Sequence, residues 1–301
     1  MRSLLNFTKM NIAYCFSLPF WERVKYLLVK SIPTIIIGKV KHNLIHAYWG
    51  WGTNNFGDLL TPMLLKYYGL SPVHAYERKA RYVGVGTLLG HITTSYKGVI
   101  MGSGLNDPIT KLFPHAQIIG LRGKLSQQML QLESQPIVLG DPGLLASRIF
   151  PERQAKKWVL GIVPHLSEKN HPIVKKWERQ FKDKNVKFIN VIQSPEKAIK
   201  EIDQCSHIFS SSLHGLVIAD SLEIPNCRFI IEGAHVYKYN DFRFDDYYSA
   251  LNVEGTKIKV NGEETLEQIM SSMRDDFSML EPMKDNLDMM FKKFVKEYKI
   301  A

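Results

Sequence analysis

Short apolar runs alternate with amphipathic runs along most of the chain, and this alternation predicts a succession of strands and helices. Runs typical of buried strands occur at residues 44–49, 82–85, 99–101, 117–120, 137–139, 159–163, 186–191, 207–210 and 226–231. Runs with apolar residues at helical spacing occur at 59–68, 124–132, 172–181, 195–204, 213–222, 239–251, 264–275 and 283–298. Strands therefore regularly precede helices.

The polar, helix-poor stretch at residues 150–156 divides this alternation into two blocks. Alternating strands and helices form parallel, doubly wound sheets with helices on both faces. We therefore expect an α/β protein with two Rossmann-like domains facing a crevice, at residues 41–152 and 153–262. A basic, apolar-rich segment at 1–40 precedes them, and C-terminal helices at 263–301 follow. Ligands of such sheets bind beyond the carboxyl ends of the strands, so the loops after strands are the expected functional sites.

The loop after the first predicted strand is rich in glycine and polar residues. It reads Tyr-Trp-Gly-Trp-Gly-Thr-Asn-Asn-Phe-Gly-Asp from Tyr48 to Asp58. Glycine lets the backbone turn sharply or approach a ligand closely, and the N–H groups that begin the next helix would face the loop. The loop is either a plain strand-to-helix turn or a place where a ligand approaches the backbone.

A second loop combines serines with a histidine. Ser210, Ser211 and Ser212 end the predicted strand at 207–210, and His214 falls in the first turn of the next helix. A serine hydroxyl is a preferred cap for the first N–H groups of a helix, and the groups left over favour an anion there. This position favours a functional role for His214 over a structural one.

The formal net charge of +10 and the pI near 9.3 indicate an anionic partner. Nucleic acid is not expected, because the basic residues are scattered and no nucleic-acid motif is present. No stretch approaches the ~20 apolar residues of a membrane-spanning helix, and no convincing signal peptide is present. Residues 21–41 alternate basic and bulky apolar groups, so they either lie on an anionic leaflet or form a packed helix and strand.

The three cysteines Cys15, Cys205 and Cys227 are far apart and form no CxxC pair. Such a set suits reduced thiols in the cytosol better than a disulfide framework. No cluster of zinc-binding spacing is present, so no metal is expected.

Taken together, these stretches resemble the polysaccharide pyruvyl transferase family from about residue 43 to about residue 255. The resemblance rests on Asn55-Phe-Gly-Asp58, on Gly120-Leu-Arg-Gly123 followed by Gly140-Asp-Pro142, and on Ser211-Ser-Leu-His-Gly-Leu-Val-Ile-Ala-Asp220 with Ile224-Pro225. Members move pyruvate from phosphoenolpyruvate onto two hydroxyls of a sugar and form a cyclic ketal. Their fold resembles that of GT-B glycosyltransferases. The resemblance implies an enzyme of surface polysaccharide or exopolysaccharide biosynthesis that uses phosphoenolpyruvate as donor and needs no cofactor.

The resemblance also implies roles for residues at the predicted strand ends. His214 is the expected general acid or base. Asp58 would accept a hydrogen from a sugar hydroxyl or orient His214, or it is simply an acidic residue in the first turn of a helix. Asn55 and Gly57 would contact the acceptor. Asp141 is expected to cap its loop.

For binding of the donor, the motifs offer several candidate residues. In some members, phosphoenolpyruvate is held by an arginine that lies two residues before the histidine. This chain has Ser212 at that position. The candidates for holding the donor are Arg122, Ser211, Ser212, His165 and Lys238.

Two other functions remain open at this stage. One is a glycosyltransferase of the same architecture with a nucleotide-sugar donor, and the other is a non-enzymatic basic protein that binds membrane or polyanion. For the pyruvyltransferase, the expected acceptor is a sugar or a lipid-linked oligosaccharide. The expected location is the cytoplasm, with peripheral contact to an anionic membrane.

Overall fold

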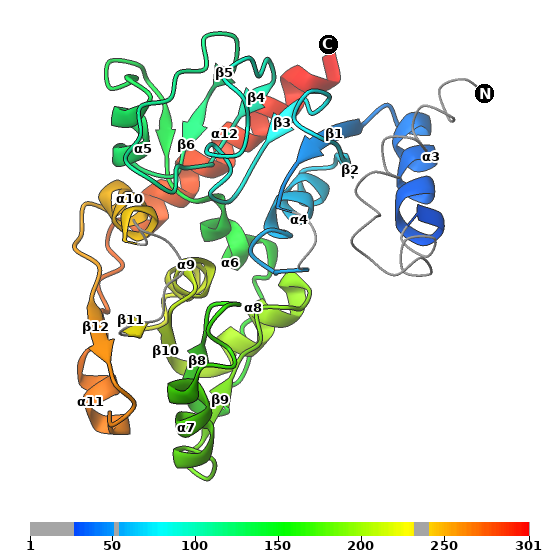
Figure 1. The fold of residues 1–301 in the computed structure, drawn as a ribbon. Helices are drawn as coiled ribbons and strands as arrows, with labels where there is room; N and C mark the ends of the chain where they lie inside the picture. The colour runs from blue at the N-terminus through cyan, green and yellow to red at the C-terminus, as the bar shows by residue number, and fades with distance from the viewer. Residues whose placement is uncertain (1–26, 51–53, 232–240, 301) are drawn as a thin grey trace.

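Two five-stranded sheets form the frame of the protein in a computed structural model, which describes residues 27–50, 54–231 and 241–300 (Figure 1). The first sheet has the order β2-β1-β3-β4-β5, and the second has the order β12-β11-β10-β8-β9. A short pair, β6-β7, extends from the loops beyond the first sheet. Every pairing between these strands is parallel. The predicted α/β class with parallel sheets is confirmed, whereas the GT-B arrangement stays a prediction.

The strands are short, as in many doubly wound sheets. Their bounds are β1 Leu44–Tyr48, β2 Ser71–His74, β3 Tyr82–Val83, β4 Val99–Ile100, β5 Gln117–Ile118, β6 Gly120–Leu121, β7 Val138–Leu139, β8 Trp158–Val163, β9 Val186–Phe188, β10 Cys205–Ser210, β11 Asn226–Ile231 and β12 Lys257–Val260.

Several helices begin at a side-chain cap that the sequence supplies. Ser194 and Thr265 each accept a hydrogen bond from a backbone N–H in the first helical turn, and Thr265 forms a capping box with Gln268. The helical bounds are η2 Leu27–Ser31, α3 Ile32–Val40, α4 Leu60–Tyr67, α5 Lys124–Met129, η3 Pro142–Leu145, α6 Ala146–Ile149, α7 Pro172–Gln180, α8 Pro195–Asp203, α9 Leu213–Ser221, α10 Phe242–Leu251, α11 Leu266–Ser271 and α12 Leu280–Ile300.

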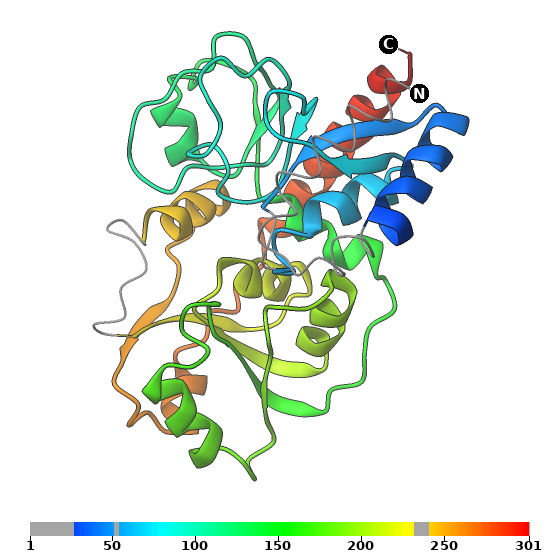
Figure 2. The ribbon, with the colours of Figure 1, turned by 45° about the vertical axis from the view of Figure 1, so that its right-hand side comes forward.

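Helix α9 lies between the two sheets, where Figures 1 and 2 show it near the centre of the molecule. Eight of its nine residues are buried, the exception being His214. One hydrophobic cluster joins residues of both sheets around it, including Ala47 of β1, Ile208 of β10 and Leu216 of α9. The sheets are therefore held together by a shared core rather than by a thin linker.

The last helix, α12, returns to the first sheet (Figure 1). Its Phe291 stacks on Tyr68 with ring centroids 4.7 Å apart, and its Phe294 lies 5.5 Å from the ring of Tyr82. The hydroxyl of Tyr298 donates a hydrogen bond to the carbonyl of Leu44 at 2.7 Å. The C-terminal residues thus complete the core of the N-terminal half.

Two strands of the structure were not predicted from the sequence. Strand β2 contains Pro72 and has only four residues, so its apolar signal is weak. Strand β12 reads Lys-Ile-Lys-Val at the edge of its sheet, where alternate side chains face solvent. The strand predicted at 117–120 is two strands, because the chain leaves the first sheet at Ile119 to form β6. The predicted domain boundaries stay predictions.

Residues 27–40 are helical, so the part of the predicted N-terminal segment that the structure describes contains no strand. Residues 1–26 and Cys15 lie outside the described part. Cys205 and Cys227 are buried thiols without a disulfide, and burial raises the pKa of Cys205 to about 12. Within the described ranges, every helix is too short or too polar to cross a bilayer.

Candidate active site

The glycine-rich loop after β1 reaches across to the second sheet. The N–H of Phe56 donates to the carbonyl of Val191 at 2.9 Å, and Asn55 forms an antiparallel bridge with Ile192 just beyond β9. The side chain of Phe56 is fully buried in the shared core. Asn55 also accepts a hydrogen bond from the N–H of Gly57 at 3.0 Å, which fixes the turn. These contacts therefore fix the loop both before and after Phe56.

Two glycines of this loop make room for other side chains of the protein. A Cβ atom at Gly57 would lie 2.1 Å from Nδ1 of His214, so the imidazole ring packs directly on the backbone there. A Cβ atom at Gly50 would lie 2.4 Å from Oδ1 of Asp58. The two stretches that the sequence singled out, around Asp58 and around His214, therefore meet in space. The third glycine, Gly52, lies outside the described residues.

A buried carboxylate faces the other side of the His214 ring. Oδ1 of Asp141 accepts a hydrogen bond from the N–H of Gly143 at 2.8 Å and caps η3. Its Oδ2 lies 3.6 Å from Nε2 of His214, and neither of these two atoms has a hydrogen-bond partner among the residues that the structure describes. The side chain of Asp141 is 0% exposed, and that of His214 is 13% exposed. Asp141 is thus a cap, as expected, and also the carboxylate aimed at the histidine, which sequence reasoning missed.

The serines after β10 brace the end of that strand against β8. The hydroxyl of Ser210 donates to the carbonyl of Val163 at 2.9 Å and accepts from the N–H of Ser212 at 3.0 Å. The N–H of Ser211 donates to the same Val163 carbonyl. The amides predicted to hold the donor are therefore bonded within the protein, and donor binding by Ser211 and Ser212 stays a prediction.

His165 and Glu168 lie beside Ser211, in the loop after β8. The hydroxyl of Ser211 donates to Glu168 and accepts from the N–H of His165. Burial, reinforced by the positive charge of Arg243, lowers the pKa of His165 to about 4. Burial raises the pKa of Glu168, although the Ser211 hydrogen bond and the charges of Arg243 and Arg228 oppose this. This edge of the second sheet therefore combines polar groups with positive charge.

Arg122 is fully buried and bonds to a different set of residues. Its Nε donates to Asp246 of α10 at 2.9 Å, its Nη1 to Thr87 at 2.9 Å and its Nη2 to the carbonyl of Leu105 at 2.5 Å. Asp246 also accepts from the N–H and hydroxyl of Ser126 at the start of α5. This network fits a residue that joins α10 to the first sheet, and donor binding by Arg122 stays a prediction. Lys238 lies outside the described residues.

The structure thus brings Gly57, Asp141 and His214 into contact, and places Asp58 beside Gly50 of the same loop. His165 and Ser211 form a neighbouring group on the next loop of the second sheet. Among the described residues, no three His, Cys, Asp or Glu side chains gather closely enough to hold a metal ion.

The fold is of the α/β class with parallel sheets, and proteins of this class generally bind ligands beyond the carboxyl ends of the strands, where Asp141 and His214 lie. The chain belongs to the polysaccharide pyruvyl transferase family, whose model matches residues 4–231. It is also similar to an uncharacterized protein of Acanthamoeba polyphaga mimivirus, with 28% identity over 172 residues. That match covers 54% of this chain and 57% of the viral protein, so the chain spans little more than half of this relative. No solved structure matches the chain.

Proposed function

We propose that the protein transfers pyruvate from phosphoenolpyruvate to two hydroxyls of a sugar and forms a cyclic ketal. Family membership supports a pyruvyl transferase that acts on a sugar or polysaccharide. The observation that carries the proposal is the pair formed by His214 and the buried carboxylate of Asp141, held against the glycine-rich loop.

The reaction requires a balanced movement of protons. Two sugar hydroxyls each lose a proton as their oxygens bond to C2 of the donor, the enol methylene gains one proton, and the phosphate leaves with the other. His214 is the group that moves a proton between a hydroxyl and the donor. Asp141 can accept a hydrogen bond from Nε2 of His214 and so hold the ring with that nitrogen protonated.

Asp141 therefore acts through His214 and is a positioning residue. The gap of 3.6 Å between the two atoms is longer than a hydrogen bond, so the proposal requires the ring to approach Asp141 when the substrates bind. Asp58, placed beside Gly50 in the facing loop, is the second carboxylate proposed to accept a hydroxyl hydrogen, and Asn55 and Gly57 are proposed acceptor contacts.

The donor's phosphate and carboxylate need cations and N–H groups. We assign the donor to the surroundings of His165, Ser211 and Ser212, where Arg243 supplies positive charge, although the N–H groups of these three residues already bond within the protein. The positive end of α9 adds to this field. Under this assignment Arg243→Gln raises the KM for phosphoenolpyruvate more than it lowers kcat.

The test is an assay of the full chain with phosphoenolpyruvate and a panel of sugars and lipid-linked oligosaccharides. Phosphate release and the mass gain of a ketal-linked pyruvate are measured together. Both signals are expected in the parent and are expected to fall in His214→Gln. Nucleotide release from a sugar nucleotide, without phosphate release from phosphoenolpyruvate, would indicate the glycosyltransferase instead.

A further inference from the structure

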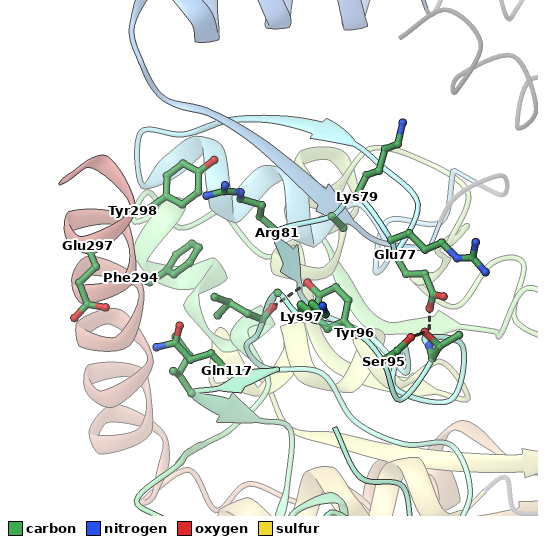
Figure 3. Close-up of a pocket in the computed structure, with 16 residues that line it drawn as sticks. Glu77, Lys79, Arg81, Ser95, Tyr96, Lys97, Gln117, Phe294, Glu297 and Tyr298 are labelled. Carbon is green, nitrogen blue, oxygen red and sulfur yellow. Dashed lines mark hydrogen bonds between the residues drawn. The ribbon is translucent and has the colours of Figure 1, made fainter. Parts of the chain in front are cut away.

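A cavity of about 860 Å³ opens at the amino-terminal edge of the first sheet (Figure 3). Its walls include the residues just before β3 and β4 and the first residue of β5, so it lies at the edge opposite to the loops that hold His214. Four cationic side chains line it, namely Arg78, Lys79, Arg81 and Lys97. Figure 3 shows Phe294 and Tyr298 of α12 closing one side. The proposed reaction uses none of these residues.

Two carboxylates, Glu77 and Glu297, also line the cavity. The carboxylate of Glu77 accepts a hydrogen bond from the N–H of Thr93 at 2.6 Å, so it already has a partner within the protein. The cavity therefore carries an excess of positive charge and suits an anionic group.

The helical segment η2–α3 presents large apolar side chains to solvent next to this edge. They are Leu28, Val29, Ile36, Ile37 and Val40, which are exposed by 58%, 64%, 57%, 48% and 75%. Ile36 and Val40 are one helical turn apart, so they share a face. The other side of α3 packs on the protein through Gly38, where a Cβ atom would lie 2.8 Å from that of Ser71 in β2. Exposed apolar groups gathered in this way mark an interaction surface.

The apolar segment and the cationic cavity both adjoin the amino-terminal edge of the first sheet, since Gly38 of α3 packs on Leu44 at the start of β1, and Tyr298 of the cavity wall bonds to Leu44. Lys39, near the end of α3, acts on His46 of β1 together with Arg81 and Lys79. Burial is the largest cause that lowers the pKa of His46, and the charges of Arg81, Lys79 and Lys39 lower it further. Exposed Lys30 lies between Val29 and Ile36 in the sequence, and exposed Lys41 follows Val40. We call η2–α3 and the four cavity cations the docking surface.

We propose that the docking surface binds an anionic lipid bilayer, with the apolar side chains of η2–α3 in the headgroup region and lipid phosphates at the cavity cations. Bulky apolar groups flanked by lysines are the composition of segments that lie in a membrane interface. Each cation near an anionic leaflet adds to this attraction. A bilayer offers apolar and anionic groups together, which a soluble anion does not. This inference does not depend on the proposed reaction.

The experiment measures binding of the full chain to vesicles by sedimentation. Vesicles of phosphatidylcholine alone are compared with vesicles that contain one third phosphatidylglycerol. The parent is expected to bind the anionic vesicles at least tenfold more strongly, and added salt is expected to weaken this binding. Equal binding to both kinds of vesicle, or none, would overturn the proposal.

Two double variants test the two halves of the surface. Lys79→Gln/Arg81→Gln removes two cations, and Ile36→Ser/Ile37→Ser removes two apolar side chains. Each is expected to weaken binding to anionic vesicles roughly tenfold or more.

Each double variant has a matched control on another surface. Lys182→Gln/Lys197→Gln removes two exposed cations of the second half, and Ile109→Ser/Leu112→Ser removes two apolar side chains that are 59% and 46% exposed. Both controls are expected to bind like the parent. Losses as large in the controls as in the tested variants would refute a defined surface. A parent that is dimeric without lipid, and an Ile36→Ser/Ile37→Ser variant that is monomeric, would assign the apolar face to a second copy of the chain instead.

Discussion

Oδ2 of Asp141 lies 3.6 Å from Nε2 of His214, although Asp141 follows β7 and His214 follows β10 of a different sheet. The pair therefore exists only when both halves of the chain are in place. Because Asp141 is fully buried and uses its other oxygen to cap η3, its position is fixed by the fold. The ring of His214, in contrast, keeps 13% exposure.

Loss of the His214 imidazole should abolish most of the turnover. His214→Gln keeps a side chain that forms hydrogen bonds but cannot carry a proton, so kcat is expected to fall roughly a hundredfold or more with little change in donor KM. Asp141→Asn is expected to lower kcat by roughly tenfold or more and to alter the pH profile of kcat. A purely structural Asp141 would change the melting temperature and leave the shape of that profile unchanged.

Adding one methyl group at Gly57 should displace the histidine. The new Cβ atom would fall 2.1 Å from Nδ1 of His214, which is closer than atoms can approach, so the ring must leave its place. Turnover of Gly57→Ala is expected to fall at least tenfold. Gly90→Ala is the matched control, because a Cβ atom there meets nothing within 4 Å. Parental kcat in Gly57→Ala would show that the ring position is unimportant.

The pair of Arg122 and Asp246 should be a large contributor to stability. Asp246→Ala leaves a buried guanidinium without its carboxylate, which is expected to cost about 3–5 kcal/mol in the free energy of unfolding by urea. The control is Asp285→Ala, whose carboxylate pairs with Arg148 but is 64% exposed, and whose loss is expected to cost under about 1 kcal/mol.

Arg122→Lys separates the bracing role from donor binding. Lysine cannot reproduce the three hydrogen bonds of the guanidinium, so a lower melting temperature is expected. Weaker affinity for phosphoenolpyruvate at an unchanged melting temperature would instead place the donor at Arg122.

Acid should destabilise the protein in part through His74. Burial lowers the pKa of this ring to about 4, although a hydrogen bond with the carbonyl of Trp49 opposes the change. In the unfolded chain the ring takes up a proton near pH 6.5, whereas in the folded protein it stays neutral down to about pH 4. Its contribution is therefore complete above pH 6.5 and is lost as the pH falls toward 4.

His74→Gln should flatten this dependence. Between pH 7 and pH 4.5 the parent is expected to lose up to about 3 kcal/mol more unfolding free energy than the variant. Urea unfolding at the two pH values measures the difference, with His91→Gln at an exposed position as control. Identical pH dependence in the parent and in His74→Gln would contradict the assignment.

Turnover with phosphoenolpyruvate is expected to survive chelation. The proposed proton transfers use His214 and carboxylates of the chain, and the metal-ligand spacings sought in the sequence are missing. An assay with and without a chelator measures this. Complete loss of activity that one divalent ion restores would refute the expectation.

Much of the fold could be predicted from local pattern. Strand β11 matches its predicted range, and most helices end within a few residues of theirs, because apolar periodicity and proline or serine at helix starts are local signals. Strand β12 could not be recognised in this way, since an edge strand with two lysines has little apolar signal.

The site was predicted only in part, for a different reason. His214 and the glycine-rich loop carry local signatures, but the contact between Asp141 and His214 depends on how two sheets pack, which no local pattern encodes. The same holds for Arg122. Its motif is visible in the sequence, whereas its burial against Asp246 follows from the place of α10.

The return of α12 to the first sheet sets the order in which the protein can mature during synthesis. Tyr298 bonds to Leu44 across 254 positions of sequence, so β1 leaves the ribosome long before the helix that completes its core. Segments made first normally fold first. Part of the apolar surface of the N-terminal sheet, including the rings of Tyr68 and Tyr82, therefore stays uncovered until α12 has been made.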